Sequence, residues 1–343
     1  METVDIRLTT SITTAAGSLG DRSGVRLRLD TDDGGLTGSG GTAPIPGAPD
    51  AISLEDIASA VRGWAESAPG RTVAELLESL DSNHLPPPAR FAAHTALADI
   101  AARDAGLPLC QWLRAGCTPR IHTNSLISQE TPKDVHAAVS QAVADGVRAV
   151  KLKVGAAEPA VDATRIIAAS EAGGTETDLR LDANRSWTKE QTIKIIGRVG
   201  PYRIDYVEDP TPNPMEYGSI TAETGVAMAI DVTPAESKDL DRTLERTGAD
   251  VLVVKAAAAG GIDRIIDTSR SLDQSKRLVV SSSIDGPIGL LAGVHAAAAL
   301  PSEGIPHGLA TATYVRGMPD LLLPVNGSIA LDDSPGLSAL DDV

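Results

Sequence analysis

From about residue 122 onward, the sequence alternates between short β-rich runs and amphipathic helical segments, which is typical of successive parallel βα units. The β-rich runs are HTNSLIS, RAVKLKV, DLRLDAN, RIDYVED, VAMAID, DVLVVKA and RLVVSSS, with a weaker last run near HGLATA. Seven or eight consecutive units without a Gly-x-Gly-x-x-Gly turn favour a closed barrel over an open dinucleotide-binding sheet. We therefore predict an α/β fold built on a (β/α) TIM-type barrel.

The N-terminal part of the chain has the pattern of a separate α+β unit. VDIRLTTSIT and GVRLRLDTDD alternate like strands, and we expect the glycine-rich stretch GGLTGSGGTAPIPGAPD after them to be a mobile loop. Two helical patterns then lead to His84-Leu-Pro-Pro-Pro, where proline interrupts the chain before a long apolar helix. We predict an α+β domain over residues 1–88, completed by the C-terminal segment 312–343, and a barrel domain over residues 89–311.

Composition and charge argue against several classes of protein. The 343 residues carry a formal net charge of −16, and no Lys/Arg cluster interleaved with aromatic residues offsets it, which disfavours nucleic-acid binding. The N-terminal METVDIRLTT lacks the pattern of a secretion signal, and no run of 18 apolar residues predicts a membrane span. Cys110 and Cys117 form no disulfide framework. We expect a cytoplasmic protein, and the sequence leaves the oligomeric state open.

Polar residues recur at the end of each β-rich run, at intervals of 23 to 29 residues. They are Lys151 and Lys153, Asp182 and Asn184, Glu208 and Asp209, Asp231, Lys255, and Ser281, Ser282 and Ser283. In a barrel the carboxyl ends of parallel strands meet at one face, where the active site of this architecture is built. We therefore expect these side chains to be neighbours around one site.

Three of these residues, Asp182, Glu208 and Asp231, form a candidate metal site. Three carboxylates in a partly buried barrel mouth repel one another strongly and need a compensating cation. Because no His or Cys accompanies them, oxygen-preferring Mg²⁺ is the expected ion, and Mn²⁺ is a possible substitute.

The lysines around this site predict removal of a proton from the carbon next to a carboxylate. Such a proton is weakly acidic, so the developing enolate needs the positive charge of a metal and an ammonium group. Lys151 and Lys153 lie on the same face of a strand, and a second ammonium together with a divalent cation would lower the pKa of Lys153. Lys153 is thus the candidate base, and Lys255 is expected across the substrate from it.

The motifs KLKVG, LRLDAN, VEDP, AID and VVKAAAAGG, in this order and spacing, resemble the muconate-lactonizing subgroup of the enolase superfamily. Within it, RLDAN, SSSIDGPIGL and HGLATATYV are similar to the o-succinylbenzoate synthases of menaquinone biosynthesis. The resemblance implies a capping domain on a modified barrel, and a Mg²⁺-dependent hydro-lyase acting on a small succinylated cyclohexadiene carboxylate. It further implies that Lys153 is base and acid, and that Lys255 stabilises the enolate.

The remaining candidates have structural explanations as well as functional ones. Lys151 and Arg180 are candidates for binding substrate, although each is equally compatible with a structural ion pair. Ser281, Ser282 and Ser283 are candidates for binding a substrate carboxylate, with helix capping as the alternative. Asn184 and Asp209 are expected to orient neighbouring carboxylates.

The third metal ligand is open between two residues. The strand reads Asp231-Val232-Thr233, where an Asp-Glu-Ser pattern is common in the family that the chain resembles, and Glu236 follows. Asp231 is preferred because its spacings to Glu208 and Lys255 fit the repeat.

Three alternative functions stay open. An N-succinylamino acid racemase or a dipeptide epimerase of the same superfamily would use both lysines as acid and base on opposite faces of the substrate. A Schiff-base aldolase would use one barrel lysine as a nucleophile, without a metal. A noncatalytic ligand-binding barrel would bind its ligand without turnover.

Overall fold

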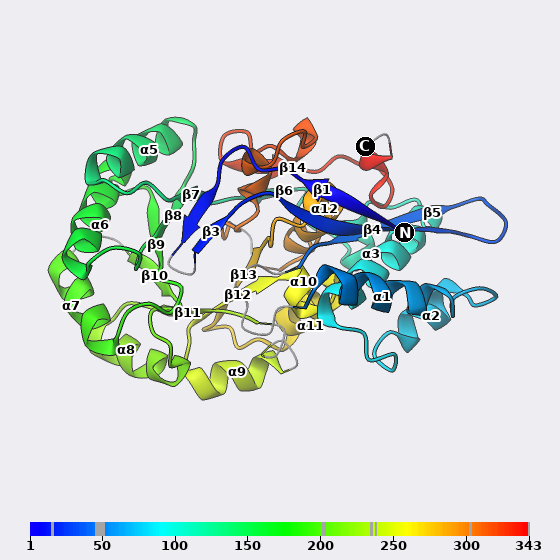
Figure 1. The fold of residues 1–343 in the computed structure, drawn as a ribbon, viewed down its shortest axis with the longest axis horizontal. Coiled ribbons are helices and arrows are strands. Elements are labelled where there is room, and N and C mark those ends of the chain that lie inside the picture. Colours follow the sequence, from blue (N-terminus) through cyan, green and yellow to red (C-terminus); the bar gives the residue numbers. More distant parts are fainter. Residues whose placement is uncertain are drawn as a thin grey trace.

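The computed structural model describes residues 1–14, 17–44, 52–200, 204–233, 236, 239–301 and 304–341. Seven parallel strands form one sheet in chain order, each hydrogen-bonded to the next (Figure 1). They are β7 (Ser125–Ile127), β8 (Ala149–Lys153), β9 (Asp178–Asp182), β10 (Ile204–Glu208), β11 (Met228–Asp231), β12 (Val251–Lys255) and β13 (Arg277–Ser281). All seven strong β-rich runs of the sequence are strands, which confirms the predicted α/β barrel architecture.

The weaker last run closes the barrel without forming a strand. His307 bridges Thr123 beside β7, and Gly308 bridges Ser281 at the end of β13. Two backbone hydrogen bonds of 2.8 Å, from the N–H of His307 and that of Gly308, support these bridges. The chain then turns at once into the 3₁₀-helix η3 (Ala310–Tyr314), so the eighth position consists of two bridging residues.

Helices follow the strands along the outside of the barrel, and the earlier ones form the curved rim in Figure 1. They are α5 (Pro132–Ala144), α6 (Pro159–Gly173), α7 (Lys189–Val199), α8 (Tyr217–Thr224), α9 (Leu240–Thr247), α10 (Ala256–Ala259), α11 (Ile262–Ser271) and α12 (Gly286–Ala298), with η1 (Pro214–Glu216) before α8. Helix α7 shows why such segments fold: Thr188 and Gln191 form a capping box at its start. Thr192, Ile195, Ile196 and Val199 are buried on one face at helical spacing, so packing on the barrel stabilises the helix.

A second unit packs beside the barrel. Strands β1 (Glu2–Ile6), β4 (Arg22–Asp30) and β5 (Thr37–Thr42) form an antiparallel sheet, and β2 (Ile12–Thr14) pairs with β3 (Gly17–Leu19) as a hairpin. Helices α1 (Leu54–Ala65), α2 (Val73–Ser79) and α3 (Pro87–Asp104) complete the unit. The molecule thus has the predicted N-terminal α+β capping domain.

The prediction of a mobile glycine-rich loop is wrong for residues 37–42, which form strand β5. The glycines have a packing role, because a Cβ at Gly40 would lie 1.9 Å from the carbonyl oxygen of Ala92 on α3, and one at Gly38 would lie 2.1 Å from that of Ala96. Only glycine allows the strand to approach the helix so closely. The part of the predicted loop at residues 45–50 lies outside the described residues.

Helix α3 joins the two units. Ala92 and Ala96 belong to the hydrophobic core shared with the capping sheet, whereas Ala98 and Ala102 belong to the core of the barrel. The division of the chain after residue 88 stays a prediction.

The C-terminal segment runs back toward the N-terminal unit, where the N–H of Arg316 donates to the carbonyl oxygen of Arg7 at 2.8 Å. It also contains η4 (Asp320–Leu322), β14 (Ser328–Ala330) and η5 (Ser338–Leu340). Strand β14 pairs with β6 (Arg120–His122), which lies after the short helix α4 (Leu109–Leu113).

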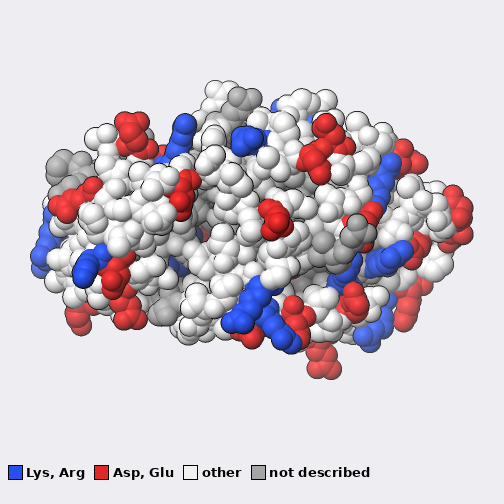
Figure 2. Space-filling view, turned by 90° about the horizontal axis from the view of Figure 1, so that it is seen from above, with Lys and Arg blue, Asp and Glu red and all other residues white. Residues whose placement is uncertain are grey.

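On the face seen in Figure 2, acidic and basic side chains are interspersed over a mostly uncharged surface. Among the described helices, none combines the length and apolar character that crossing a membrane requires.

Candidate active site

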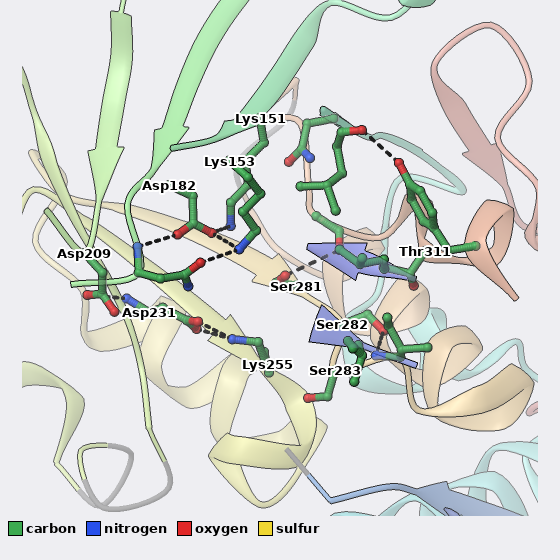
Figure 3. Close-up of a pocket in the computed structure, with 18 of the residues that line it drawn as sticks. Lys151, Lys153, Asp182, Asp209, Asp231, Lys255, Ser281, Ser282, Ser283 and Thr311 are labelled. Atoms are coloured by element: carbon green, nitrogen blue, oxygen red, sulfur yellow. Dashed lines mark hydrogen bonds and ion pairs between the residues drawn. The ribbon is translucent and has the colours of Figure 1, made fainter. Parts of the chain in front are cut away.

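A cavity of about 460 Å³ lies at the carboxyl ends of the barrel strands (Figure 3). Its charged wall consists of Lys151, Lys153, Asp182, Arg185, Asp209, Asp231 and Lys255. Its other walls are formed by Ser281, Ser282, Ser283 and Thr311, and by apolar residues that include Leu126, Val232, Ile284 and Tyr314. The capping hairpin β2–β3 contributes Ile12, Gly17, Ser18 and Leu19. Both units of the fold therefore build this one cavity.

The strand register brings the predicted lysines and carboxylates together at one level of the barrel. Asp182 is the register partner of both Lys153 on β8 and Glu208 on β10. Lys153 Nζ donates to Asp182 Oδ2 at 2.7 Å and to Asn184 Oδ1 at 3.1 Å. Lys151 Nζ lies 2.8 Å from Asp182 Oδ2 and 2.6 Å from Glu208 Oε1. Residues that are distant in the sequence thus form one buried charge network.

Burial and charge perturb this network strongly. Burial alone would lower the pKa of Lys151, but Asp182 and Glu208 outweigh it and hold that pKa well above its usual value. Burial would raise the pKa of Asp182, but the ammonium groups of Lys151 and Lys153 hold it well below the usual range. For Glu208, burial and repulsion from Asp182 raise the pKa. The neighbouring carboxylates therefore favour the charged form of Lys151, whereas the surroundings of Glu208 disfavour its charged form.

Lys255 lies on the other side of the cavity. It ends β12, next to Asp231 at the end of β11, and its ammonium contacts both carboxylate oxygens of Asp231. In Figure 3, Lys153 and Lys255 reach toward the same open space from two sides. A molecule bound between them would have an ammonium near each of its faces.

The two candidates for the third carboxylate have different surroundings, and the choice of Asp231 as the metal ligand stays a prediction. Asp231 lines the cavity, whereas Glu236 does not. Glu236 accepts a hydrogen bond of 2.9 Å from the N–H of Thr233, which follows β11.

Asn184 and Asp209 lie beside the network, where they contact its members. Asn184 accepts from Lys153, and its own N–H donates to Asp182 Oδ1 at 3.1 Å. Asp209 Oδ1 accepts from the hydroxyl of Tyr217 at 2.9 Å and from the N–H of Asp231 at 3.4 Å. Burial raises the pKa of Asp209 to about 6, and Arg185 opposes that shift.

The backbone is strained at the same place. Asn184, Arg185 and Asp209 have φ angles of 46°, 62° and 43°, which residues other than glycine rarely adopt. Such conformations persist where surrounding contacts impose them, and they concentrate at functional sites.

The structure does not bring Arg180 to the cavity. Its side chain is 1% exposed, and Nε donates to Asp205 Oδ2 at 2.9 Å while Nη1 donates to the carbonyl oxygen of Pro306 at 2.7 Å. Its guanidinium also lies 4.9 Å from the ring centre of Tyr206. These contacts give Arg180 a structural environment inside the barrel.

The three serines do reach the cavity. Ser282 Oγ accepts from the N–H of Ile284 at 2.9 Å, which is a turn contact. Ser283 is 3% exposed, and among the described residues its hydroxyl has no hydrogen-bond partner. Its carbonyl oxygen accepts from Arg22 of the capping unit at 2.6 Å. The capping unit thus fixes the backbone of a serine whose hydroxyl remains available to a ligand.

The residues present fit a divalent cation. Among the described residues, no three acidic, histidine or cysteine side chains are gathered as a ready-made metal group, and lysines contact each of the three carboxylates. Glu208 Oε2 is nevertheless buried without a hydrogen-bond partner in the described part of the chain. A buried carboxylate oxygen without a partner is costly, and a hard cation held by Asp182, Glu208 and Asp231 would remove that cost.

Arg185 and the hairpin residues are among the cavity residues that have no counterpart in the sequence-based candidates. Arg185 follows the recognised RLDAN pattern directly, so a cation next to that pattern was the available signal. The hairpin residues Ile12, Ser18 and Leu19 carry no such signal, because an apolar residue in a strand pattern is usually a core residue.

Comparison with known proteins supports this picture. Residues 134–340 match the family model described as enolase C-terminal domain-like. D-Ala-D/L-Ala epimerase of Cytophaga hutchinsonii is 28% identical over 61% of this chain and 57% of its own length. The o-succinylbenzoate synthase of Mycolicibacterium smegmatis is 31% identical over 54% of this chain and 58% of its own length. The chain thus spans less than two thirds of either curated relative, and the two activities are similarly close.

A solved structure extends the likeness to the whole fold. The dipeptide epimerase of Enterococcus faecalis, in complex with Mg and the dipeptide L-Leu-L-Tyr, superposes with a TM-score of 0.85 at 22% identity. The match covers 98% of this chain and 97% of that structure.

Proposed function

The chain belongs to the enolase C-terminal domain-like family of the enolase superfamily, and on that premise we propose that it is an o-succinylbenzoate synthase. The reaction is the dehydration of 2-succinyl-6-hydroxy-2,4-cyclohexadiene-1-carboxylate to o-succinylbenzoate in menaquinone biosynthesis. The observation that carries the proposal is the placement of Lys153 and Lys255 on two sides of one cavity, next to Asp182 and Asp231. A cytoplasmic location is part of the same prediction.

The proposed reaction needs a metal site, which Asp182, Glu208 and Asp231 would form. Mg²⁺ bound there would supply positive charge to the substrate carboxylate as the adjacent carbon loses its proton. The solved dipeptide epimerase with bound Mg is consistent with this assignment.

The chain's own residues divide the proton transfers between them. Lys153 Nζ, as a free amine, takes the proton from the carbon next to the carboxylate. The ammonium of Lys255 stabilises the negative charge that develops on the enolate. The same proton then passes from Lys153 to the leaving hydroxyl, the C–O bond breaks, and water departs as the ring becomes aromatic. Lys151 remains a cation throughout, because its pKa is held well above the usual value.

The cavity also bears on the substrate class. The acidic residues that line it are Asp182 and Asp231, which contact lysines, and Asp209, which contacts Arg185. Among the described lining residues, the serine-rich wall contributes no carboxylate that could pair with a dipeptide's free ammonium, and Asp285 behind that wall accepts from the N–H of Ser283 at 3.0 Å. This favours a substrate with an acyl or succinyl arm over a free dipeptide.

A second candidate is racemization of N-succinylamino acids. The same two-sided placement of Lys153 and Lys255 favours it, since one lysine would remove the proton and the other would return one to the opposite face. The similarity to an epimerase also supports this alternative.

The first experiment is an ultraviolet assay of the purified protein with the cyclohexadiene substrate, in Mg²⁺ and in EDTA, alongside Lys153→Ala. We expect aromatic product that depends on both the metal and Lys153. No product from folded, Mg²⁺-loaded protein contradicts the synthase, and N-succinylamino acids would then be tested by loss of optical activity. Metal-independent trapping of a substrate by borohydride would instead identify a Schiff-base enzyme. Ligand binding without any turnover would identify a noncatalytic barrel.

A further inference from the structure

Arg185 connects three successive strand ends of the barrel. It lies after β9, and its N–H donates to the carbonyl oxygen of Asp209 after β10 at 2.6 Å. Its Nε donates to Asp209 Oδ2 at 3.0 Å. Its Nη2 lies 3.6 Å from Glu236 Oε1, after β11. These are the ends of the three strands that carry Asp182, Glu208 and Asp231.

Both acidic partners of Arg185 accept hydrogen bonds from the backbone at or near Asp231. The Asp209 carboxylate accepts from the N–H of Asp231 at 3.4 Å and from the hydroxyl of Tyr217 at 2.9 Å. The Glu236 carboxylate accepts from the N–H of Thr233, two residues after Asp231. A shift of the Arg185 side chain would therefore alter the backbone position at the end of β11, which carries Asp231.

The surroundings of Arg185 include strained backbone and a buried guanidinium nitrogen. Its φ of 62° and that of Asp209, 43°, are both left-handed, so each backbone is held in a conformation that costs energy. Nη2 of Arg185 is buried and makes no hydrogen bond within the described part of the chain, although Glu236 is nearby. The guanidinium is held mainly by Asp209, through its Nε, and its planar group lies between Asp209 and Glu236.

We propose that Arg185 is a positioning residue that holds Asp182, Glu208 and Asp231 at the mutual distances required to bind a divalent cation. The proposal rests on the metal site of the proposed function and adds a residue outside the three carboxylates. Hydrogen-bonded residues behind metal ligands orient those ligands, and their loss typically lowers metal affinity by about 10- to 100-fold.

The test is calorimetric titration of Mg²⁺ into full-length, EDTA-treated protein without substrate. Arg185→Met keeps the aliphatic stem and removes the guanidinium, so we expect the dissociation constant for Mg²⁺ to rise about 10- to 100-fold. Arg185→Lys keeps the charge but cannot reach Asp209 and Glu236 at the same time. Its dissociation constant for Mg²⁺ should therefore lie between those of Arg185→Met and the wild type. The matched control is Arg198→Met, an exposed arginine on the following helix, which should bind Mg²⁺ like the wild type.

Further outcomes separate this proposal from its alternatives. If Arg185→Met does not fold, Arg185→Lys carries the test, with circular dichroism as the check of folding. Unchanged Mg²⁺ affinity in a folded Arg185 variant overturns the positioning role, and a raised KM in that variant would make Arg185 a substrate contact instead. A wild-type protein that binds no Mg²⁺ contradicts the metal of the proposed function itself and removes the basis of this inference.

Discussion

The ammonium of Lys151 lies 2.6 Å from Glu208 Oε1, although 57 residues separate the two in the sequence. Lys151 also contacts Asp182, so one lysine neutralises part of the charge of two carboxylates. Its side chain is 13% exposed and that of Glu208 is 1% exposed, so water screens the pair little. This pairing assigns different tasks to neighbouring lysines: Lys151 compensates charge, and Lys153 is left for chemistry.

We therefore expect replacement of Lys151 to lower the stability of the folded protein, because its main role is to compensate buried charge. Lys151→Met leaves Asp182 and Glu208 without their shared cation, and breaking a buried ion pair of this kind costs about 3–5 kcal/mol. We expect that loss in the free energy of unfolding, measured by urea denaturation in EDTA, and a smaller loss in saturating Mg²⁺. Lys194→Met on the exposed face of α7 is the control. Equal stability of the two variants would show that Lys151 has no such role.

The two sides of the cavity give a prediction about Lys255. Lys255→Ala and Lys153→Ala should each lower kcat of the synthase reaction by about 10²- to 10⁴-fold, because each removes a group that acts on the transition state. Exchange of the α-proton of N-succinylamino acids in D₂O separates their roles. Each variant should lose exchange with one enantiomer and retain it with the other. Loss of exchange with both enantiomers in either variant would contradict the two-sided arrangement.

The close contact between β5 and α3 predicts a large effect of one methyl group. Gly40→Ala would place a Cβ 1.9 Å from the carbonyl oxygen of Ala92, so the helix and strand must separate. We expect a destabilisation of about 3 kcal/mol, measured by denaturant unfolding. Gly197→Ala is the matched control, since its Cβ meets no atom within 4 Å and alanine favours a helix by up to about 1 kcal/mol. A Gly40→Ala protein as stable as the wild type would refute the packing argument.

Two buried histidines predict loss of stability in acid. Burial lowers the pKa of His295 and that of His307 to about 3, from 6.5 in an unfolded chain. As the pH falls below about 6.5 the unfolded chain takes up these protons first, so stability is full above that pH and declines towards pH 3. Each histidine should contribute a slope of about 1.4 kcal/mol per pH unit between these values.

A variant isolates one of these contributions. His307 Nδ1 accepts from the N–H of Val280 at 3.1 Å, and the side-chain oxygen of asparagine can accept the same bond without titrating. Between pH 6 and pH 4, His307→Asn should reduce the slope of the unfolding free energy against pH by about 1.4 kcal/mol per pH unit, the contribution of one proton. His136→Asn, at an exposed histidine, should leave the slope unchanged. An unaltered slope in His307→Asn would mean that His307 does not contribute to the loss of stability in acid.

The sequence alone determined the order of the strands and the positions at which chemistry-bearing side chains occur. Strand periodicity and the recurrence of Lys153, Asp182, Glu208, Asp231 and Lys255 follow from local patterns, since each strand end is fixed by its own hydrophobic run. Because the barrel brings successive strand ends to one face, that order was enough to predict a common site.

Tertiary structure decided which side chains meet. Arg180 has the strand-face position of a site residue, yet Asp205 and the carbonyl oxygen of Pro306 hold it away from the cavity. Arg185 and the hairpin residue Leu19 line the cavity because a strained turn and a separate domain place them there. Such contacts join residues far apart in the chain, and their energies depend on burial and mutual distance, which local sequence patterns do not encode.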